Sequence, residues 1–166
     1  MAVGEKQVEG VEFGAAGILM RNWQISAGLA FMDTEITRGN RSSANNGAAQ
    51  TEGGVIQWSP EVTFTLWNSY TFESGLILGG GARFVDTMVS SSLTNEQAQS
   101  TRSVLEFGDY WVVDAMASYP VTKNAIVQLN VLNITDEDYI AGLNNGGSRY
   151  YPGAPLSARL GVTFNF

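Results

Sequence analysis

Apolar and polar residues alternate along the last eleven residues of the chain. The apolar set is Leu156, Ala158, Leu160, Val162, Phe164 and Phe166, and the polar or small residues between them are Ser157, Arg159, Gly161, Thr163 and Asn165. Successive side chains of a β-strand point to opposite faces, so this pattern predicts a strand with one apolar face. Strands of soluble proteins usually have about five or six residues. A tilted strand needs about ten residues to cross the hydrocarbon core of a membrane, and the length therefore indicates a membrane strand.

Six further segments show the same period of two. They cover residues 11–17, 23–31, 62–72, 76–85, 111–119 and 124–132, and the fourth and sixth of them are less strict. Together with the C-terminal segment they make about seven strands, each long enough to span a membrane. We therefore predict an all-β fold, an antiparallel transmembrane β-barrel segment in which long strands follow one another as a meander.

Short and long connections alternate between the predicted strands. The short ones are residues 21–22, 73–75 and 120–124, and the long polar ones are residues 38–57, 90–107 and 135–151. Outer-membrane barrels have short periplasmic turns and long extracellular loops, so the three long segments are expected outside the cell. Aromatic residues near the strand ends are typical of interfacial girdles. The expected girdle residues are Trp23, Phe31, Phe72, Tyr110, Trp111, Tyr119 and Phe166.

The composition of the chain mainly excludes certain kinds of site and partner. The chain has 166 residues, a formal net charge of −7, and neither Cys nor His. Without these two residue types a Ser-His-Asp triad, a Cys-His pair, disulfides and imidazole or thiolate metal sites are excluded, and we expect no enzyme. The negative charge argues against nucleic acid as a partner. Neither a helical span of about 20 apolar residues nor a signal peptide is visible in the sequence.

Two other folds remain compatible with alternating strands. A soluble sugar-binding β-sandwich also has alternating strands and many turns. A small self-contained outer-membrane barrel with a structural or adhesive role would need an even number of strands. Strand length, alternating loop length and the terminal Phe166 favour the membrane fold over the sandwich. An odd number of strands favours part of a larger barrel over a small closed one.

The order of several motifs resembles the barrel of TonB-dependent receptors. The motifs are residues 10–13, Trp23 with residues 28–33, Pro60 with Phe64, Leu66, Trp67 and Tyr70, residues 111–115 with Ser118 and Tyr119, residues 129–136 with Tyr139, and residues 149–155. The most specific is residues 129–136, which is similar to the Asn-rich penultimate strand of the family and its Asn-x-x-Asp turn. This order covers nearly the whole chain. One departure is Leu156, because the family usually has Arg after Pro-Gly-Ala-Pro.

The resemblance implies a barrel of about 22 strands closed around a plug domain, in the outer membrane of a Gram-negative bacterium. Residues 144–150 before Pro-Gly-Ala-Pro are most similar to siderophore receptors of the ferric-catecholate type. We therefore expect residues 1–166 to be the C-terminal part of such a receptor barrel, with the plug domain and the N-terminal strands absent. The implied partners are outer-membrane lipid, a ferric siderophore as the transported ligand, and TonB and the plug domain through the missing part.

Candidate ligand-binding residues lie in the predicted long loops. In the implied topology Arg149, Tyr150 and Tyr151 lie at the extracellular mouth. There an arginine attracts an anionic ferric catecholate and aromatic rings stack on catechol, although an aromatic girdle with a loop anchor is the structural alternative. Arg38 and Arg41 lie in another long loop and could attract the same anionic complex.

Three charged residues within strands are expected to face the lumen. A charge that faces lipid is costly, so we expect Glu12, Arg83 and Asp114 to point into the lumen. We expect their role there to be structural, with Arg83 paired to Glu12 or to a carboxylate of the plug. Asn68 interrupts an apolar row, and the pattern gives no reason for it. The acidic residues 136–138 lack the spacing of a calcium loop, and we expect a turn. We expect no catalytic residue, no metal and no bound cofactor in this chain.

Overall fold

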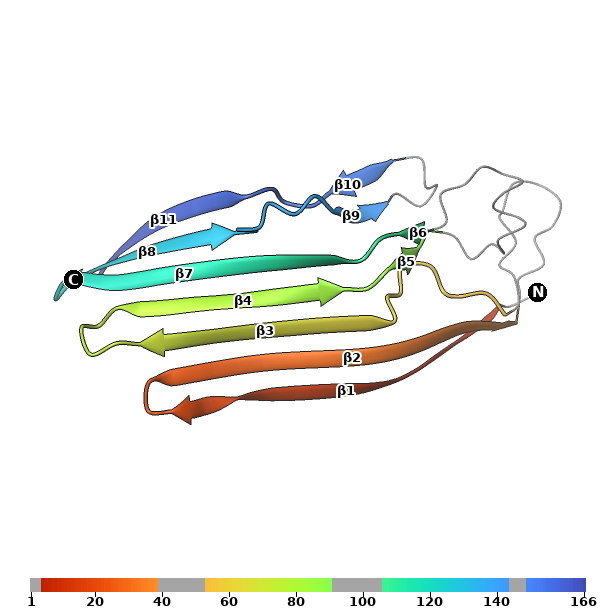
Figure 1. Cartoon of the computed structure of the whole chain (residues 1–166), viewed down its shortest axis with the longest axis horizontal. Helices are drawn as coiled ribbons and strands as arrows, with labels where there is room; N and C mark the ends of the chain where they lie inside the picture. Colours follow the sequence, from red (N-terminus) through yellow and green to blue (C-terminus); the bar gives the residue numbers. More distant parts are fainter. Residues whose placement is uncertain (1–3, 39–52, 91–105, 144–148) are drawn as a thin grey trace.

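The fold is all-β and is dominated by one large antiparallel sheet (Figure 1). The computed structural model describes residues 4–38, 53–90, 106–143 and 149–166. The main sheet consists, in order, of β1 (Glu5–Met20), β2 (Trp23–Arg38), β3 (Val62–Thr71), β4 (Ile77–Val85), β7 (Tyr110–Thr122), β8 (Ala125–Leu132) and β11 (Ser157–Phe164). Each of these strands pairs with the next in a meander. The seven long antiparallel strands are therefore confirmed.

Strands β1 and β2 are longer than the alternation predicts. Beyond the predicted residues 11–17 and 23–31, the ladder continues and sets Glu9 opposite Asp33 and Gln7 opposite Glu35. These polar pairs lie on the face that is apolar in the middle of the sheet, while the other face carries Val8 opposite Thr34, two residues before the buried Ile36. The alternation therefore changes phase there, although the backbone pairing persists. Ladder hydrogen bonds join backbone groups whatever the side chains are, and hydropathy therefore marks the end of the apolar face rather than the end of the strand.

Short turns join the strands at one end of the sheet. In the second turn Gly75 has φ of 84° and donates its N–H to the carbonyl of Phe72 at 2.9 Å. Glycine adopts this left-handed conformation without strain. The third turn is shorter than the predicted residues 120–124, because β7 continues to Thr122. Pro120 has no N–H for the ladder, and it is accommodated where the register with β8 shifts between Pro120 and Thr122.

The opposite end of the sheet carries four short strands where long polar loops were expected. These are β5 (Met88–Val89), β6 (Glu106–Phe107), β9 (Ile140–Leu143) and β10 (Tyr150–Pro152), which form the two-stranded sheets β5-β6 and β10-β9. Strands this short cannot show a period in the sequence. Phe107 is buried and its ring centroid lies 5.7 Å from that of Trp58. Phe107 and Trp58 thus form a small apolar cluster that stabilises this end of the sheet.

Many large apolar side chains of the main sheet lie on its surface. Leu160 is 72% exposed and Phe13 is 61% exposed, whereas Ile36 and Val112 are among the few that are fully buried. The described strands do not form the two large packed sheets that a soluble β-sandwich requires. In the part of the chain that the structure describes, no helix has the length and apolar character to cross a membrane. So large an exposed apolar surface indicates apolar surroundings.

Candidate functional site: a wall with two faces

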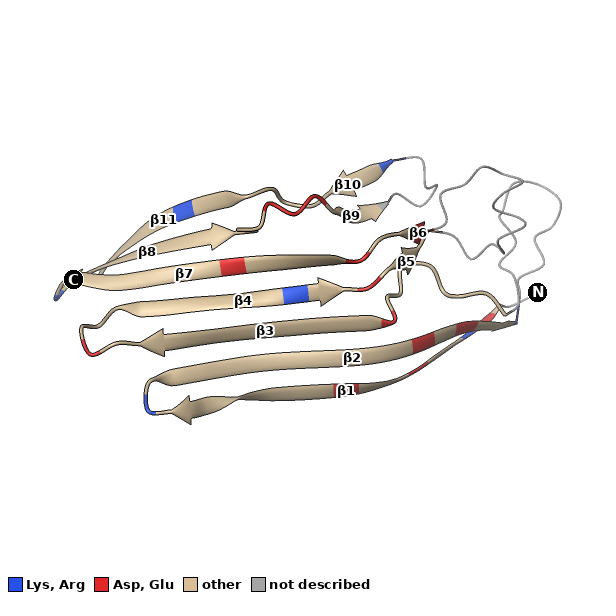
Figure 2. Ribbon diagram, in the orientation of Figure 1, with Lys and Arg blue, Asp and Glu red and all other residues tan. Residues whose placement is uncertain are grey.

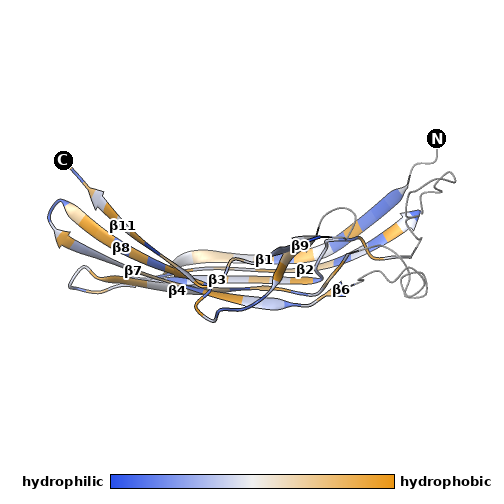
Figure 3. Cartoon of the chain, turned by 90° about the horizontal axis from the view of Figure 1, so that it is seen from above, coloured by the Kyte–Doolittle hydropathy of each residue, from blue (hydrophilic) through white to orange (hydrophobic). Residues whose placement is uncertain are grey.

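The register of the main sheet sorts its side chains onto two faces. Residues directly opposite each other on antiparallel strands point to the same side. One face is apolar and includes Phe13, Leu29, Phe64, Leu66, Phe84, Val113, Leu129 and Leu160. The other face includes Glu12, Ser26, Thr65, Arg83, Asp114, Asn130 and Arg159. Few charged residues lie in the middle of the sheet, and apolar and polar segments alternate along its strands (Figures 2 and 3).

Aromatic residues form two belts on the apolar face. One belt consists of Phe31, Phe64, Phe84 and Trp111, and the other of Trp23, Tyr70 and Tyr119. The ring of Trp111 lies 4.9 Å from that of Phe84, between centroids. Trp23 and Phe31 are eight positions apart, as are Trp111 and Tyr119. Eight positions span about 26 Å along a strand, which is about 20 Å of height for a strand tilted by about 40°, somewhat less than the apolar band of about 25 Å on outer-membrane barrels.

Tyr110 does not belong to a girdle, and the prediction for it is wrong. It lies opposite Val85, on the same face as Arg83 and Asp114. Its ring stacks on that of Tyr139, with centroids 4.2 Å apart. Tyr110 therefore connects the polar face of the wall with the segment that follows β8.

Arg83 and Asp114 meet on the polar face. Nη1 of Arg83 lies 3.8 Å from Oδ2 of Asp114, and the side chain of Arg83 is 47% exposed. Oδ1 of Asp114 also accepts a hydrogen bond of 2.8 Å from the backbone N–H of Asn133. Both charged residues border a hollow of about 290 Å³, which Trp67 also lines. An ion pair this exposed contributes at most about 1 kcal/mol, so Arg83 remains available to a second carboxylate.

Glu12 shares the polar face but does not take part in this ion pair. It lies on β1, which β2 and β3 separate from Arg83 on β4. Its cross-strand neighbour is Ala30, and the hollow of about 320 Å³ beside it is lined in part by Gly14 and Gly28. Small neighbours leave the exposed carboxylate of Glu12 open to a partner.

The structure explains Asn68, which interrupts the apolar row of β3. Asn68 lies opposite Gly80, and its Nδ2 donates to the carbonyl of Gly80 at 2.8 Å. The bond joins the amide to the backbone of the neighbouring strand. An amide without a partner on an apolar face would cost free energy, and this bond removes part of that cost.

The candidate ligand residues that the structure describes lie at the end of the sheet that carries the short strands (Figure 1). Tyr150 and Tyr151 are in β10 and are 65% and 61% exposed, and the exposed Arg149 directly precedes them. Arg38 is the last residue of β2 rather than a loop residue, because the ladder continues to the pair Glu5 and Arg38. Arg41 lies outside the described residues. The structure thus places Tyr150 and Tyr151 in one strand with Arg149 directly before it, and leaves Arg38 near the other edge of the main sheet.

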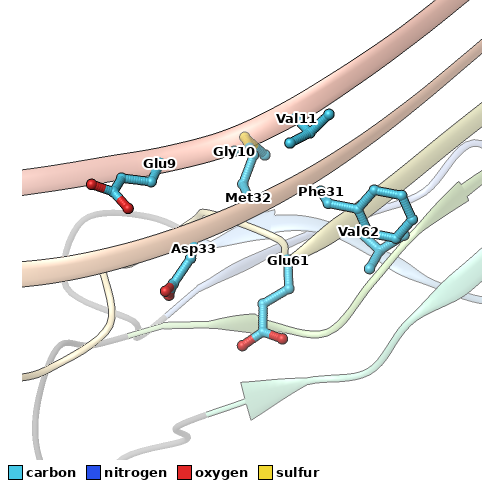
Figure 4. Close-up of a pocket in the computed structure, with 8 residues that line it drawn as sticks. All are labelled: Glu9, Gly10, Val11, Phe31, Met32, Asp33, Glu61 and Val62. Atoms are coloured by element: carbon cyan, nitrogen blue, oxygen red, sulfur yellow. The ribbon is translucent and has the colours of Figure 1, made fainter.

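A hollow of about 540 Å³ lies toward the loop end of β1 and β2 (Figure 4). The carboxylates of Glu9, Asp33 and Glu61 lie in one part of it and the apolar side chains of Phe31 and Val62 in another. The hollow therefore lies where the apolar face ends, just beyond the aromatic belt that contains Phe31. Within the described ranges no group of three or more acidic side chains could hold a metal ion.

The sequence pattern singled out residues 129–136 but missed the position of Asn133. This residue is 1% exposed, with φ of 52°. Its burial depends on the return of residues 153–156 to the same place, which no local pattern shows. In the acidic turn, Oδ1 of Asp136 accepts a hydrogen bond of 3.0 Å from the backbone N–H of Leu156.

The chain is similar to known receptors over almost its whole length. The family described as TonB dependent receptor-like, beta-barrel, matches residues 1–134. The catecholate siderophore receptor Fiu of Escherichia coli is 35% identical over 163 residues, which are 98% of this chain and 20% of that protein. The probable TonB-dependent siderophore receptor PiuA of Acinetobacter baumannii is 32% identical over 140 residues, or 82% of this chain and 18% of that one.

Solved structures agree with the sequence comparison. The ferric-catecholate import receptor Fiu of Escherichia coli in its closed form gives a TM-score of 0.81 at 32% identity, over 98% of this chain and 21% of that one. The ferripyoverdine receptor of Pseudomonas aeruginosa bound to ferripyoverdine gives 0.75 at 25% identity, over 98% and 20%. The chain thus spans about a fifth of the length of these relatives. It belongs to the TonB-dependent receptor β-barrel family, whose members lie in the outer membrane of Gram-negative bacteria.

Proposed function

We propose that this chain forms part of the barrel wall of an outer-membrane receptor that takes up a ferric siderophore of the catecholate type. The observation that carries the proposal is the division of the main sheet into an apolar face with two aromatic belts and a polar face with Glu12, Arg83 and Asp114. Such a wall separates lipid from an aqueous interior. Identity of 35% to a catecholate siderophore receptor over 98% of the chain supports the ligand class.

In this proposal the apolar face contacts outer-membrane lipid and the polar face lines the lumen. The outer strands β1 and β11 each have one edge without a partner strand in the main sheet. Backbone groups in a membrane need partners, so further barrel strands pair with these edges. A plug domain inside the lumen contacts Glu12, Arg83 and Asp114. TonB supplies energy for uptake through parts of the receptor other than this wall, and the wall itself binds no cofactor.

The ligand enters at the end of the wall that carries β9 and β10. Short turns of outer-membrane barrels are periplasmic, which places this end outside the cell. The guanidinium of Arg149 attracts an anionic ferric catecholate. The exposed rings of Tyr150 and Tyr151 are successive residues of β10, so they offer stacking surfaces for catechol on its two opposite sides. Arg38 and Arg41 add positive charge that attracts the same complex over a longer range.

Replacing Arg149, Tyr150 or Tyr151 by Ala, each in the receptor that carries this chain, is expected to weaken binding of iron(III) tris-catecholate roughly tenfold. Binding isotherms of the purified receptor and uptake of radioactive iron by iron-starved cells measure the effect. Lys123→Ala, in the short turn at the other end of the sheet, serves as the control and should change neither quantity. Uptake of ferric citrate but not of the catecholate complex would contradict the proposal.

A further inference from the structure

The segment between β8 and β11 leaves the main sheet and returns to it at a hydrogen-bonded base. We call residues 133–137 and 153–156 the hairpin base, because the β9–β10 pair lies between them. Asp136 accepts the backbone N–H of Leu156 at 3.0 Å, and the backbone N–H of Gly153 donates to the carbonyl of Tyr139 at 2.7 Å. We call residues 133–139, which lead to β9, the outgoing stem, and residues 153–156, which follow β10, the returning stem. These hydrogen bonds join the two stems next to the β9–β10 pair.

Asn133 is the buried centre of the hairpin base. Its Nδ2 donates to the carbonyls of Glu137 and Ala154, both at 3.0 Å, so one amide bonds to each stem. Its Oδ1 accepts the backbone N–H of Glu137 at 3.0 Å and the hydroxyl of Thr135 at 3.4 Å. A buried amide with every group bonded favours one arrangement of the chain around it, because any other leaves a polar group without a partner.

The hairpin base is attached to β7 of the wall. The backbone N–H of Asn133 donates to Asp114 at 2.8 Å, and that of Ile134 donates to the carbonyl of Val113 at 2.8 Å. Tyr139 stacks on Tyr110. The ring of Tyr139 also fills the space beside Gly153, where a Cβ atom would overlap it. The β9–β10 pair is hydrogen-bonded as a sheet separate from the main one, so these contacts determine where it stands on the wall.

We propose that Asn133 is a positioning residue for the ligand-binding surface. By joining both stems to β7, it holds β10 in one place, and Arg149, Tyr150 and Tyr151 with it. A surface that is already ordered binds more tightly, since less conformational freedom is lost on binding. In this arrangement the β9–β10 pair is a fixed support rather than a lid. The inference rests on the proposed function, because it assumes that residues 149–151 contact the ligand.

The test compares Asn133→Ala with Asn130→Ala in the whole receptor. Asn130 lies three residues earlier, on the polar face, and bonds to Gln128 at 3.0 Å, so it is the matched control. In Asn133→Ala we expect amides of residues 137–156 to exchange hydrogen at least about tenfold faster, with the main sheet unchanged. We expect affinity for iron(III) tris-catecholate to fall about tenfold, with an unchanged amount of receptor at the cell surface. Asn130→Ala should change neither.

A double variant separates positioning from general stability. If Asn133 acts through Arg149, Tyr150 and Tyr151, the variant with both Asn133→Ala and Tyr150→Ala should lose less affinity than the two single losses combined, because the part of the effect that passes through Tyr150 is then counted only once. Fully additive losses, or an affinity that does not fall although residues 137–156 exchange faster, would overturn the positioning role. Failure of the proposed function is recognised separately, because the unaltered receptor would then not bind the catecholate complex. If Asn133→Ala does not assemble, Asp136→Gly removes only the bond to Leu156 and tolerates the φ of 51°. The same outcomes then apply to that variant.

Discussion

Replacing Leu129 by Arg is expected to lower the free energy of unfolding of the membrane-inserted receptor by about 2–4 kcal/mol. Leu129 lies near the middle of β8, opposite Leu160 on β11 and Ala117 on β7, on the apolar face. At this depth an arginine loses its hydration and finds no carboxylate among these neighbours. The effect is measured by urea titration of the receptor folded into phospholipid vesicles, with tryptophan fluorescence as the signal.

Gln128→Arg is the matched control for this substitution. Gln128 is the preceding residue of the same strand and points to the polar face, opposite Gly161 and Ser118. In the proposed arrangement a guanidinium there lies in the aqueous lumen, and the free energy of unfolding should change by less than about 0.5 kcal/mol. Equal losses of unfolding free energy in Leu129→Arg and Gln128→Arg would show that the two faces of the sheet have the same surroundings.

Replacing Gly81 by Ala is expected to destabilise the barrel by about 1–3 kcal/mol. Gly81 lies opposite Trp67, where a Cβ atom would overlap the backbone carbonyl oxygen of Leu66 and the indole ring. A backbone oxygen cannot rotate away as a side chain can, so β3 and β4 must separate locally. The same urea titration measures the loss.

The neighbouring residue provides the control for this second prediction. At Gly80 the nearest atom to an added Cβ is the carbonyl oxygen of Asp114 at 3.5 Å, which is ordinary van der Waals contact. Gly80→Ala should therefore have a small effect. A loss as large as that of Gly81→Ala would show that any side chain in this part of β4 is harmful, and that the close approach of β3 is not the cause.

The alternation of residues predicted the main sheet because each long strand has one apolar face in its membrane-spanning part. It could not predict the ends of β1 and β2, since Glu9 and Asp33 lie opposite each other on the face that is apolar in the middle of the sheet, and the row of apolar residues stops there. The same reason explains why Arg38 was expected in a loop, although it ends β2. The ladder of backbone hydrogen bonds continues beyond that point, so the end of the apolar row does not mark the end of the strand.

The candidate site was less predictable because it depends on contacts between distant segments. The sequence motif drew attention to residues 129–136, yet the burial of Asn133 requires Ala154 to return beside it. Tyr110 resembles a girdle residue in sequence, and only the register with Val85 places it on the polar face. Asn68 likewise becomes intelligible only when Gly80 is seen opposite it. Contacts with other segments of the chain decide all three, and the sequence of a single segment does not contain that information.

The hairpin base also divides the chain into parts that tolerate changes of length differently. In β1 and β2, which have 16 residues each, inserting one residue would turn every following side chain to the other face. Between Tyr139 and Gly153 the stems are already joined, so added residues there leave the alternation of β8 and β11 intact. If this end binds the ligand as proposed, descendants of this chain can vary in length there, and so in what they recognise, while the main sheet stays the same.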